Sequence, residues 1–374
     1  MTAEPIFPHA MLKEIFEQPD ALAATLAAYT TGNELREAAF LGARHALANK
    51  ESLLIAASGS SRHAGLVAEI LFEDQANLAV DVEYASEYIY RSTQTLHNHA
   101  FMVISQSGET ADTSEALREA TARGNSTIAI TNHANSTMAK LANCSLPTLA
   151  GTEKAVPATK SFTTQLLVIE LLALYTARIR GRMTRAVVES HIQHLHAIPD
   201  AMAVMLPHWQ QQITTIASTL MDATTFLFLG RGIHFPIARE AALKLKESAY
   251  LQAQGYPTGE LKHGPNALVA PTTPLIILAT NDPSTPDSTL RYEKTVNLLR
   301  DLKKQNAEVI AIITKGDNQI ADLARHTIEV PRCPEYIAPI FEIVPLQLLA
   351  YSMAIARGID VDNPRNLVKA VVTE

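Results

Sequence analysis

Short apolar runs alternate with stretches of helical period along most of the chain. The predicted buried strands are Ser52–Ala57, Phe101–Ser105, Ser126–Thr131, Thr225–Leu229, Pro274–Thr280 and Glu308–Thr314. The predicted helices between them include Thr113–Arg123, Ile237–Leu251 and Ser288–Gln305. Buried strands that alternate with helices of about ten or more residues are typical of a parallel sheet wrapped by helices. The pattern therefore predicts an α/β protein.

The two halves of the chain resemble each other at a separation of roughly 170–185 residues, a period far too long for a solenoid. The segment LLIAASGSSRHAG corresponds to FLFLGRGIHFPIA, and STIAITNHANSTMAKLA corresponds to EVIAIITKGDNQIADLA. This repeat indicates a duplicated domain. A largely helical stretch connects the halves, and we expect the domain boundary near Pro207–Ser218. The predicted parts are an N-terminal helical segment (1–40), a first domain (41–207), a second domain (208–360) and a C-terminal tail (361–374).

Composition narrows the possible partners and the cellular compartment. The 374 residues are 47% hydrophobic and 18% charged, enough for two domain cores. A net charge of -7 argues against a nucleic-acid or anionic-membrane partner. Cys144 and Cys333 lack metal-binding spacing. Residues 1–8 have no signal-peptide pattern, and we expect a cytoplasmic location and no apolar run long enough to span a bilayer.

Hydroxyl-rich segments follow the first two predicted strands. One carries Ser105, Gln106, Ser107 and Thr110, and the other carries Ser60 and Ser61. Backbone N–H groups at a helix start, together with hydroxyl groups, can bind a phosphate with little positive charge. Ligands of open α/β sheets bind at the carboxyl ends of strands, so both segments can serve one ligand. The alternative is that these residues only cap helices and shape turns.

A predicted helix places three charged residues on one face. Glu240, Lys244 and Glu247 lie at positions i, i+4 and i+7, whereas Lys246 is expected to face solvent. A carboxylate near C1 and C2 of a sugar can move the proton that aldose–ketose isomerisation transfers. A solvated stripe of ion pairs is the alternative interpretation.

Two further residues are candidates for chemistry on a sugar. His263 precedes a Gly-Pro pair, and histidine is a side chain commonly used for acid–base catalysis. Lys369, near the end of the chain, is either a surface charge or an amine that forms a Schiff base with an open-chain ketose. The sequence has no HExxH, Walker or GxGxxG motif, so we expect no metal, ATP or dinucleotide cofactor.

Several motifs together resemble the isomerase domain of the glucosamine-6-phosphate synthase family, which consists of two sugar-isomerase (SIS) domains. The resemblance starts at MLKEIFEQP (residues 11–19) and reaches the last residue. Its most specific parts are SQSGETADT, ALKLKE, GELKHGP, APIFEIVPLQLLAY and DVDNPRNLVK, in this order. It implies two tandem SIS domains, each a flavodoxin-like three-layer α/β/α structure, and the interconversion of fructose 6-phosphate and glucosamine 6-phosphate.

The resemblance also implies roles for individual residues. Glu247 corresponds to the carboxylate that moves the proton, Lys244 and Glu240 to its supporting partners, and Lys369 to the Schiff-base lysine of a tail that covers the active site. His263 corresponds to the ring-opening acid–base that the neighbouring subunit supplies, which implies a homodimer. The implied phosphate and sugar contacts are Ser60, Ser61, Ser105, Gln106, Ser107, Thr110 and Val156.

The sequence departs from the family pattern in two respects. It contains no glutaminase domain and no cysteine after Met1, so we expect nitrogen to come from free ammonia or a separate subunit, or the reaction to release ammonia. In GTEKAVPATKSFTTQ, Pro157 is unusual and Ala158 replaces a small hydroxyl residue. A lost hydroxyl contact weakens binding by about 0.5–1.5 kcal/mol, which affects substrate preference more than reaction class.

Two other functions fit parts of this pattern. A deaminase that converts glucosamine 6-phosphate to fructose 6-phosphate and ammonia would use the same residues in the opposite direction. A non-catalytic SIS protein that senses a sugar phosphate would bind without reacting. The sensor has no need of Glu247, His263 or Lys369, all of which are present.

Overall fold

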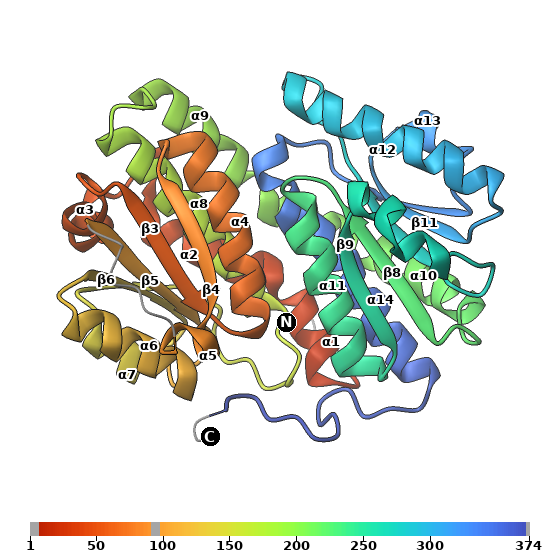
Figure 1. The fold of residues 1–374 in the computed structure, drawn as a ribbon, viewed down its shortest axis with the longest axis horizontal. Helices are drawn as coiled ribbons and strands as arrows, with labels where there is room; N and C mark the ends of the chain where they lie inside the picture. The colour runs from red at the N-terminus through yellow and green to blue at the C-terminus, as the bar shows by residue number, and fades with distance from the viewer. Residues whose placement is uncertain (1–6, 91–97, 372–374) are drawn as a thin grey trace, which may run out of the picture. The chain divides into compact units, whose positions relative to one another are not determined.

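A computed structural model describes residues 7–90 and 98–371, and in it the chain divides into two compact units (Figure 1). The described residues of the first-sheet unit fall within Asp20–Thr152, Lys160–Pro199 and Ala370–Glu374. Those of the second-sheet unit fall within Met1–Pro19, Glu153–Thr159 and Asp200–Lys369. Most of the start, where no signal peptide and no catalytic cysteine are expected, and the last three residues of the predicted tail lie outside the described residues.

Each unit is built on a five-stranded parallel sheet, and both sheets have the same strand order. The first sheet consists of β3 (Ser52–Ala57), β4 (Ala79–Tyr84), β5 (His99–Ser105), β6 (Ser126–Thr131) and β7 (Cys144–Pro147). The second consists of β8 (Thr225–Gly230), β9 (Gln252–Pro257), β10 (Leu275–Ala279), β11 (Val309–Thr314) and β12 (His326–Val330). The orders β4-β3-β5-β6-β7 and β9-β8-β10-β11-β12 are both the flavodoxin-like order. The predicted α/β fold with a duplicated domain is confirmed.

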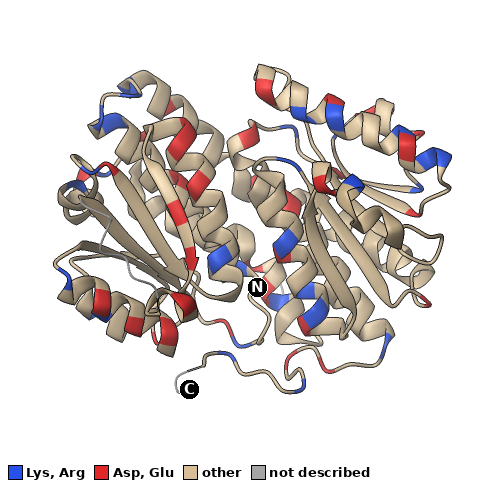
Figure 2. Cartoon of the chain, viewed as in Figure 1, with Lys and Arg blue, Asp and Glu red and all other residues tan. Residues whose placement is uncertain are grey.

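All six predicted strands are present, and the four strands of the five-stranded sheets that were not predicted form the edges of these sheets. Edge strand β4 alternates between exposed and buried positions, and it carries Asp81 and Glu83 (Figure 2). Edge strand β9 is polar, with the sequence QAQGYP. Continuous apolar runs identify strands that are buried on both faces, so partly exposed edges escape this criterion.

Helices cover both faces of the first sheet. They are α2 (Gln18–Tyr29), α3 (Leu41–Leu47), α4 (Gly59–Ala76), α5 (Ala85–Tyr88), α6 (Ala111–Ala122), α7 (Thr137–Leu141), α8 (Lys160–Ile179) and α9 (Arg185–His196). Gly65 lets α4 approach one face, since a Cβ there would lie 3.1 Å from Val82. On the other face, Leu54 and Phe101 pack in one cluster with residues of α5, α6 and α7. A hairpin of β1 (Thr30–Thr31) and β2 (Glu34–Leu35) follows α2.

The second-sheet unit repeats this arrangement around its own core. Its helices are α1 (Ala10–Phe16), α10 (Ile198–Thr219), α11 (His234–Ala249), α12 (Pro286–Lys304), α13 (Asn318–Ala321) and α14 (Ala338–Ala356). Leu299 of α12 and Ile320 of α13 pack in the cluster that contains Ile277 of the sheet. Helix α11 packs on α14 and on strands β8 and β9. Helix α12 buries one side against this core, and in Figure 2 it carries charges of both signs.

Two helices correct the expectation that no apolar stretch is long enough to span a bilayer. Helix α8 and the segment Glu335–Ala356 contain 20 and 22 residues, with hydropathies of 1.3 and 1.5. Both are core helices, because 89% and 100% of their apolar 18-residue stretches are buried inside the protein. Their composition is that of helices surrounded by protein on all sides.

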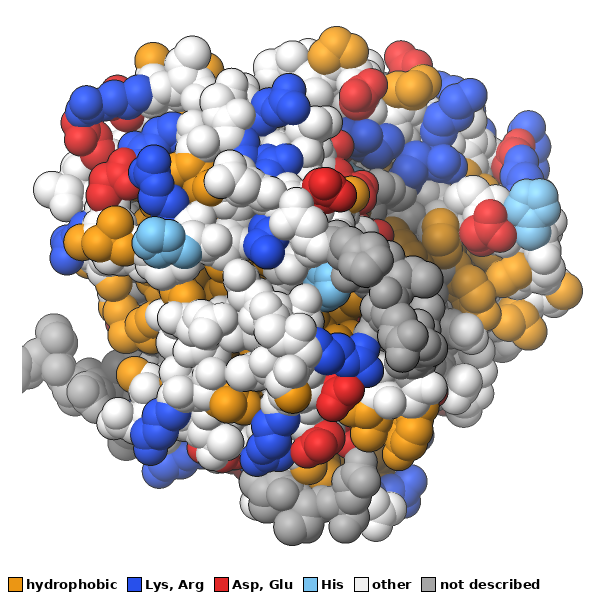
Figure 3. All heavy atoms as spheres, turned by 60° about the vertical axis from the view of Figure 1, so that its left-hand side comes forward, with side chains coloured by type: hydrophobic (Ala, Val, Ile, Leu, Met, Phe, Trp, Pro, Cys, Tyr) orange, Lys and Arg blue, Asp and Glu red, His pale blue; other side chains and the backbone are white. Residues whose placement is uncertain are grey.

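One face of the surface mixes the two signs of charge. On the face drawn in Figure 3, Lys and Arg side chains lie among Asp and Glu side chains, with apolar and uncharged groups between them. This mixture agrees with a formal net charge of only -7 on 374 residues.

Candidate active site

The loop between β5 and α6 is shaped by its own hydroxyl groups. Ser105 Oγ accepts a hydrogen bond from the N–H of Gly108 at 3.1 Å and lies 3.2 Å from Thr110 Oγ1. Ser107 Oγ accepts from the N–H of Glu109 at 3.1 Å. These bonds confirm that the hydroxyls shape the turn, whereas Thr110, at the capping position of α6, makes no side-chain capping bond. A hydroxyl that accepts such a bond keeps its own hydrogen, which it can donate to an anion.

Gly108 fixes this loop closely against its neighbours. Its φ of +67° lies in the region that favours glycine, and a Cβ there would collide with the side chains of Ser136 and Thr131. The carbonyl of Gln106 accepts a bond from the N–H of Asn132 at 3.1 Å. The side chains of Gln106 and Ser107 stay partly exposed. The loop is therefore held in one conformation, with polar groups that solvent can reach.

The segment after β3 differs from the expected turn, because Ser60 and Ser61 lie in the first turn of helix α4. Ser61 is buried, and its Oγ accepts a bond from Gln165 Nε2 of α8 at 3.1 Å. Ser60 keeps a partly exposed side chain. Because β3 and β5 are neighbouring parallel strands, both helix starts lie at the same edge of the sheet.

The charged face of helix α11 is buried rather than solvated. Lys244 Nζ lies 2.5 Å from Glu247 Oε2 and 3.5 Å from Glu240 Oε1. Lys244 and Glu240 are fully buried, whereas 22% of the Glu247 side chain is exposed. Lys246 faces solvent, as predicted. Charged residues are almost never fully buried unless paired, so the interpretation as a solvated stripe is wrong.

The pairing keeps Lys244 charged in spite of its burial. Burial would lower the pKa of Lys244, but the carboxylates of Glu247 and Glu240 outweigh it, and the pKa lies above its ordinary value. The array thus places a fixed positive charge beside Glu247, its partly exposed member. A carboxylate in this position can accept a proton from a bound molecule and return it.

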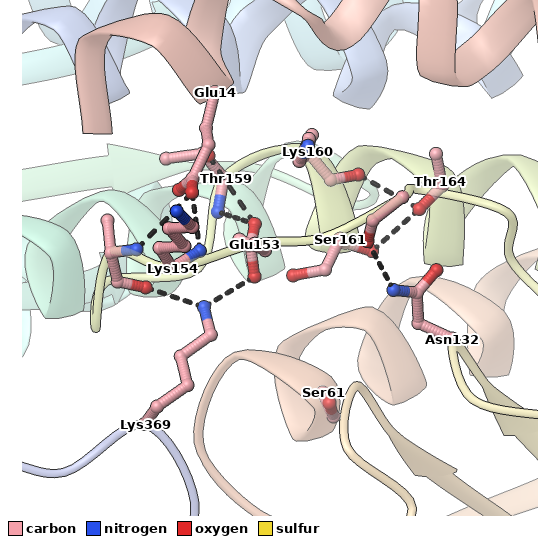
Figure 4. A network of polar contacts seen from close by, with 12 residues as sticks. Glu14, Ser61, Asn132, Glu153, Lys154, Thr159, Lys160, Ser161, Thr164 and Lys369 are labelled. Carbon is pink, nitrogen blue, oxygen red and sulfur yellow. Dashed lines mark hydrogen bonds and ion pairs between the residues drawn. The ribbon is translucent and has the colours of Figure 1, made fainter. Parts of the chain in front are cut away.

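Lys369 is tied to a buried carboxylate that the sequence analysis did not single out. Its Nζ lies 2.6 Å from Glu153 Oε2 and donates to the carbonyl of Ala155, also at 2.6 Å (Figure 4). Thr159 fixes Glu153 further, because its N–H donates to Glu153 Oε1 at 3.0 Å. Only 25% of the Lys369 side chain is exposed. Lys369 is therefore more than a surface charge.

Glu153 also connects the tail lysine to the charged array. Its carboxylate is one of the charges that raise the pKa of Lys244. Val156, three residues further along, is half-buried in the same loop. Glu153 is separated from Lys369 by 216 positions, so no local pattern could pair them.

His263 stands apart from these groups. It ends the short helix η2 (Thr258–His263) and is exposed. Within the described part of the chain, it makes no hydrogen bond or ion pair with Lys244, Glu247 or Lys369. The second-sheet unit thus brings four of its five predicted catalytic residues into one electrostatic network and leaves the histidine outside.

The edge of the second sheet that corresponds to the hydroxyl-rich edge of the first holds buried charges. His234, in the first turn of α11, bonds Glu342 and lies 3.3 Å from Glu335. Burial would lower the pKa of His234, but the carboxylates of Glu342 and Glu335 raise it to about 10. Thr280 Oγ1 donates to Glu342 at 2.6 Å. The duplicated units therefore do not present the same chemistry. Across the described residues, no three His, Cys, Asp or Glu side chains could together hold a metal ion.

Comparisons with known proteins agree with this architecture. The SIS domain model matches residues 46–175 and 219–357. Glutamine–fructose-6-phosphate aminotransferase (isomerizing) of Chlorobaculum tepidum is 40% identical over 373 residues, which cover 98% of this chain and 59% of the relative. The C-terminal domain of glucosamine-fructose-6-phosphate aminotransferase from Francisella tularensis is 34% identical, with a TM-score of 0.88, over 96% of this chain and 99% of that domain.

A third comparison concerns the fold alone. Glucosamine-6-phosphate deaminase from Thermotoga maritima has a TM-score of 0.71 at 23% identity, over 97% of this chain and 99% of that one. Fold and charged residues together define a double α/β protein with a buried Glu-Lys-Glu array. The chain belongs to the SIS domain family, and the predicted resemblance to the synthase isomerase domain is confirmed. It spans about 59% of the length of the curated relative it matches.

Proposed function

We propose that this protein is a sugar-phosphate isomerase that interconverts fructose 6-phosphate and glucosamine 6-phosphate. The observation that carries the proposal is the buried array of Glu240, Lys244 and Glu247 on α11. Transfer of a proton between C1 and C2 needs a carboxylate that can take it up and return it, and Glu247 is the partly exposed member of that array. A phosphorylated sugar as substrate also fits the cytoplasmic location that we propose.

In the proposed mechanism, each group has one task. The loop from Ser105 to Thr110, together with Ser60, Ser61 and Val156, holds the phosphate and the sugar. His263 opens the ring. The amine of Lys369 adds to C2 of the ketose and water leaves, which gives an imine. Ammonia then displaces the lysine nitrogen, and Glu247 moves the proton from C1 to C2, supported by Lys244 and Glu240.

We also propose that the active protein is a homodimer in which His263 serves the neighbouring subunit. The exposed position of His263, apart from Glu247 and Lys369, supports this arrangement. Inactive His263→Ala and inactive Glu247→Gln proteins, mixed under conditions where subunits exchange, should then recover up to about a quarter of the activity. No recovery, with exchange demonstrated by mass spectrometry, would contradict the shared site.

Incubation with glucosamine 6-phosphate tests the proposed function and its direction together. Ammonia and fructose 6-phosphate are followed in the same sample, and glucose 6-phosphate is followed from added fructose 6-phosphate. Equal release of ammonia and fructose 6-phosphate would support the deaminase direction. Formation of glucose 6-phosphate alone would support an isomerase that receives ammonia from another source. Saturable binding with neither reaction would contradict an enzyme and support the sensor.

A further inference from the structure

The C-terminal tail is fastened to the start of helix α1. Asp362 accepts hydrogen bonds from the N–H groups of Ala10 at 2.7 Å and Met11 at 2.9 Å. These are the first two residues of the helix, whose N–H groups have no partner within it. His9, at the capping position, makes no side-chain bond to the helix, and its Nδ1 lies 2.9 Å from the hydroxyl of Tyr351 instead. The Asp362 carboxylate of the tail therefore caps the N-terminus of α1.

One turn further along α1, Glu14 holds the loop that receives Lys369. Its Oε1 accepts hydrogen bonds from the N–H groups of Lys154 at 2.5 Å and Ala155 at 3.3 Å. The other side of this loop offers the Ala155 carbonyl and the Glu153 carboxylate to Lys369 (Figure 4). A single loop of the backbone thus lies between Glu14 and the tail lysine. Glu14 therefore holds the backbone of the loop that presents both acceptors of that lysine.

Burying the carboxyl group of Glu14 costs free energy that an uncharged side chain would not lose. Only 3% of the residue is exposed, and its Oε2 has no hydrogen-bond partner among the residues that the structure describes. Burial raises the pKa of Glu14 to about 7, and the Glu153 carboxylate raises it too, while the N–H of Lys154 and the Lys369 ammonium lower it. The folded state therefore favours protonated Glu14. This preference adds to the free energy of unfolding at low pH, and the contribution is lost as the pH rises through about 7. Glutamine would fill the same space without this loss.

We propose that helix α1 positions Lys369 through two carboxylates: Glu14 fixes the loop that accepts the lysine, and Asp362 fastens the tail to the helix. Both are positioning residues, since neither contacts the lysine nitrogen itself. The inference rests on the proposed function, in which Lys369 forms an imine with C2 of a ketose.

The test compares Glu14→Gln and Asp362→Asn with the wild-type protein. Lys13→Ala is the matched control, because Lys13 lies on the same helix with a side chain that is 56% exposed. Hydrogen exchange of the peptide that covers residues 359–371 reports on tail order without any chemistry. Fructose 6-phosphate with sodium cyanoborohydride reports on the reaction, because reduction of the imine leaves a stable secondary amine on Lys369 that mass spectrometry detects.

Each variant should speed exchange of the tail about tenfold and slow the trapping of Lys369 about tenfold, with little change in the KM for fructose 6-phosphate. The trapping rate of the wild type should also decline as the pH falls through about 7, because protonated Glu14 is a weaker acceptor. That step should be absent from Glu14→Gln. Lys13→Ala should match the wild type throughout.

The outcomes separate the inference from the proposed function. Wild-type exchange and wild-type trapping in both variants would overturn the positioning role and leave the proposed function standing. If the wild type turned over substrate but Lys369 was never trapped, the imine step of the proposed mechanism would be wrong. Faster hydrogen exchange of the tail in the two variants would still support the positioning of the tail by α1. Asp362 lies on the partly exposed tail, so its variant tests the inference even if Glu14→Gln folds poorly.

Discussion

Replacing Glu247 by glutamine is expected to slow the conversion of fructose 6-phosphate to glucose 6-phosphate by about 100- to 10,000-fold, the usual contribution of a general acid–base. Glutamine keeps the shape of the side chain but cannot take up the proton from C1. Coupled assay of glucose 6-phosphate gives the rate, and isothermal titration gives the affinity for the sugar phosphate, which should change little.

Glu293→Gln is a suitable control, because Glu293 is an exposed carboxylate of helix α12 in the same unit. It should keep wild-type turnover. Near-normal turnover of Glu247→Gln would show that another group moves the proton. If neither the wild type nor the variant turned over while both bound substrate, the sensor interpretation would be favoured.

Replacing Lys244 by methionine is expected to lower the free energy of unfolding of its unit by about 3–5 kcal/mol, the typical effect of breaking a buried ion pair from one side. The fully buried Glu240 and the nearby Glu247 would lose their shared positive partner. Urea denaturation followed by circular dichroism measures the loss. The same variant should lose turnover, because it no longer holds Glu247 in place.

Lys246→Met provides the matched comparison two positions along the same helix. Lys246 is exposed, so its loss should change stability by no more than about 0.5 kcal/mol. Equal stability of the two variants would mean that the Lys244 ion pairs contribute little to the unit.

The fold could be predicted from the sequence wherever both faces of a strand are buried. Strands β3 and β6 have the bounds expected from their apolar runs, because both of their faces are covered. The edge strand β4 was missed because half of its positions face solvent. The length of the apolar helix α8 was missed as well, since it is long and apolar enough to cross a bilayer, although its surroundings are protein.

The candidate site could be predicted where its residues share one element. Glu240, Lys244 and Glu247 follow helical spacing, so their common face was visible in the sequence, although their burial was not. Glu14, Glu153 and Lys369 come from three distant segments, and only folding brings them together. A lone buried glutamate has no local signature, which is why the contacts of the tail were not predicted.

Solvent deuterium exchange is the most direct measurement of the central claim, that this chain moves a proton between C1 and C2 of a sugar phosphate. Fructose 6-phosphate is incubated with the protein in D2O without any nitrogen source and is recovered for NMR. We predict deuterium at C1 of the ketose, and its disappearance when Glu247→Gln replaces the wild type. Fructose 6-phosphate that binds saturably yet returns without deuterium would contradict the account.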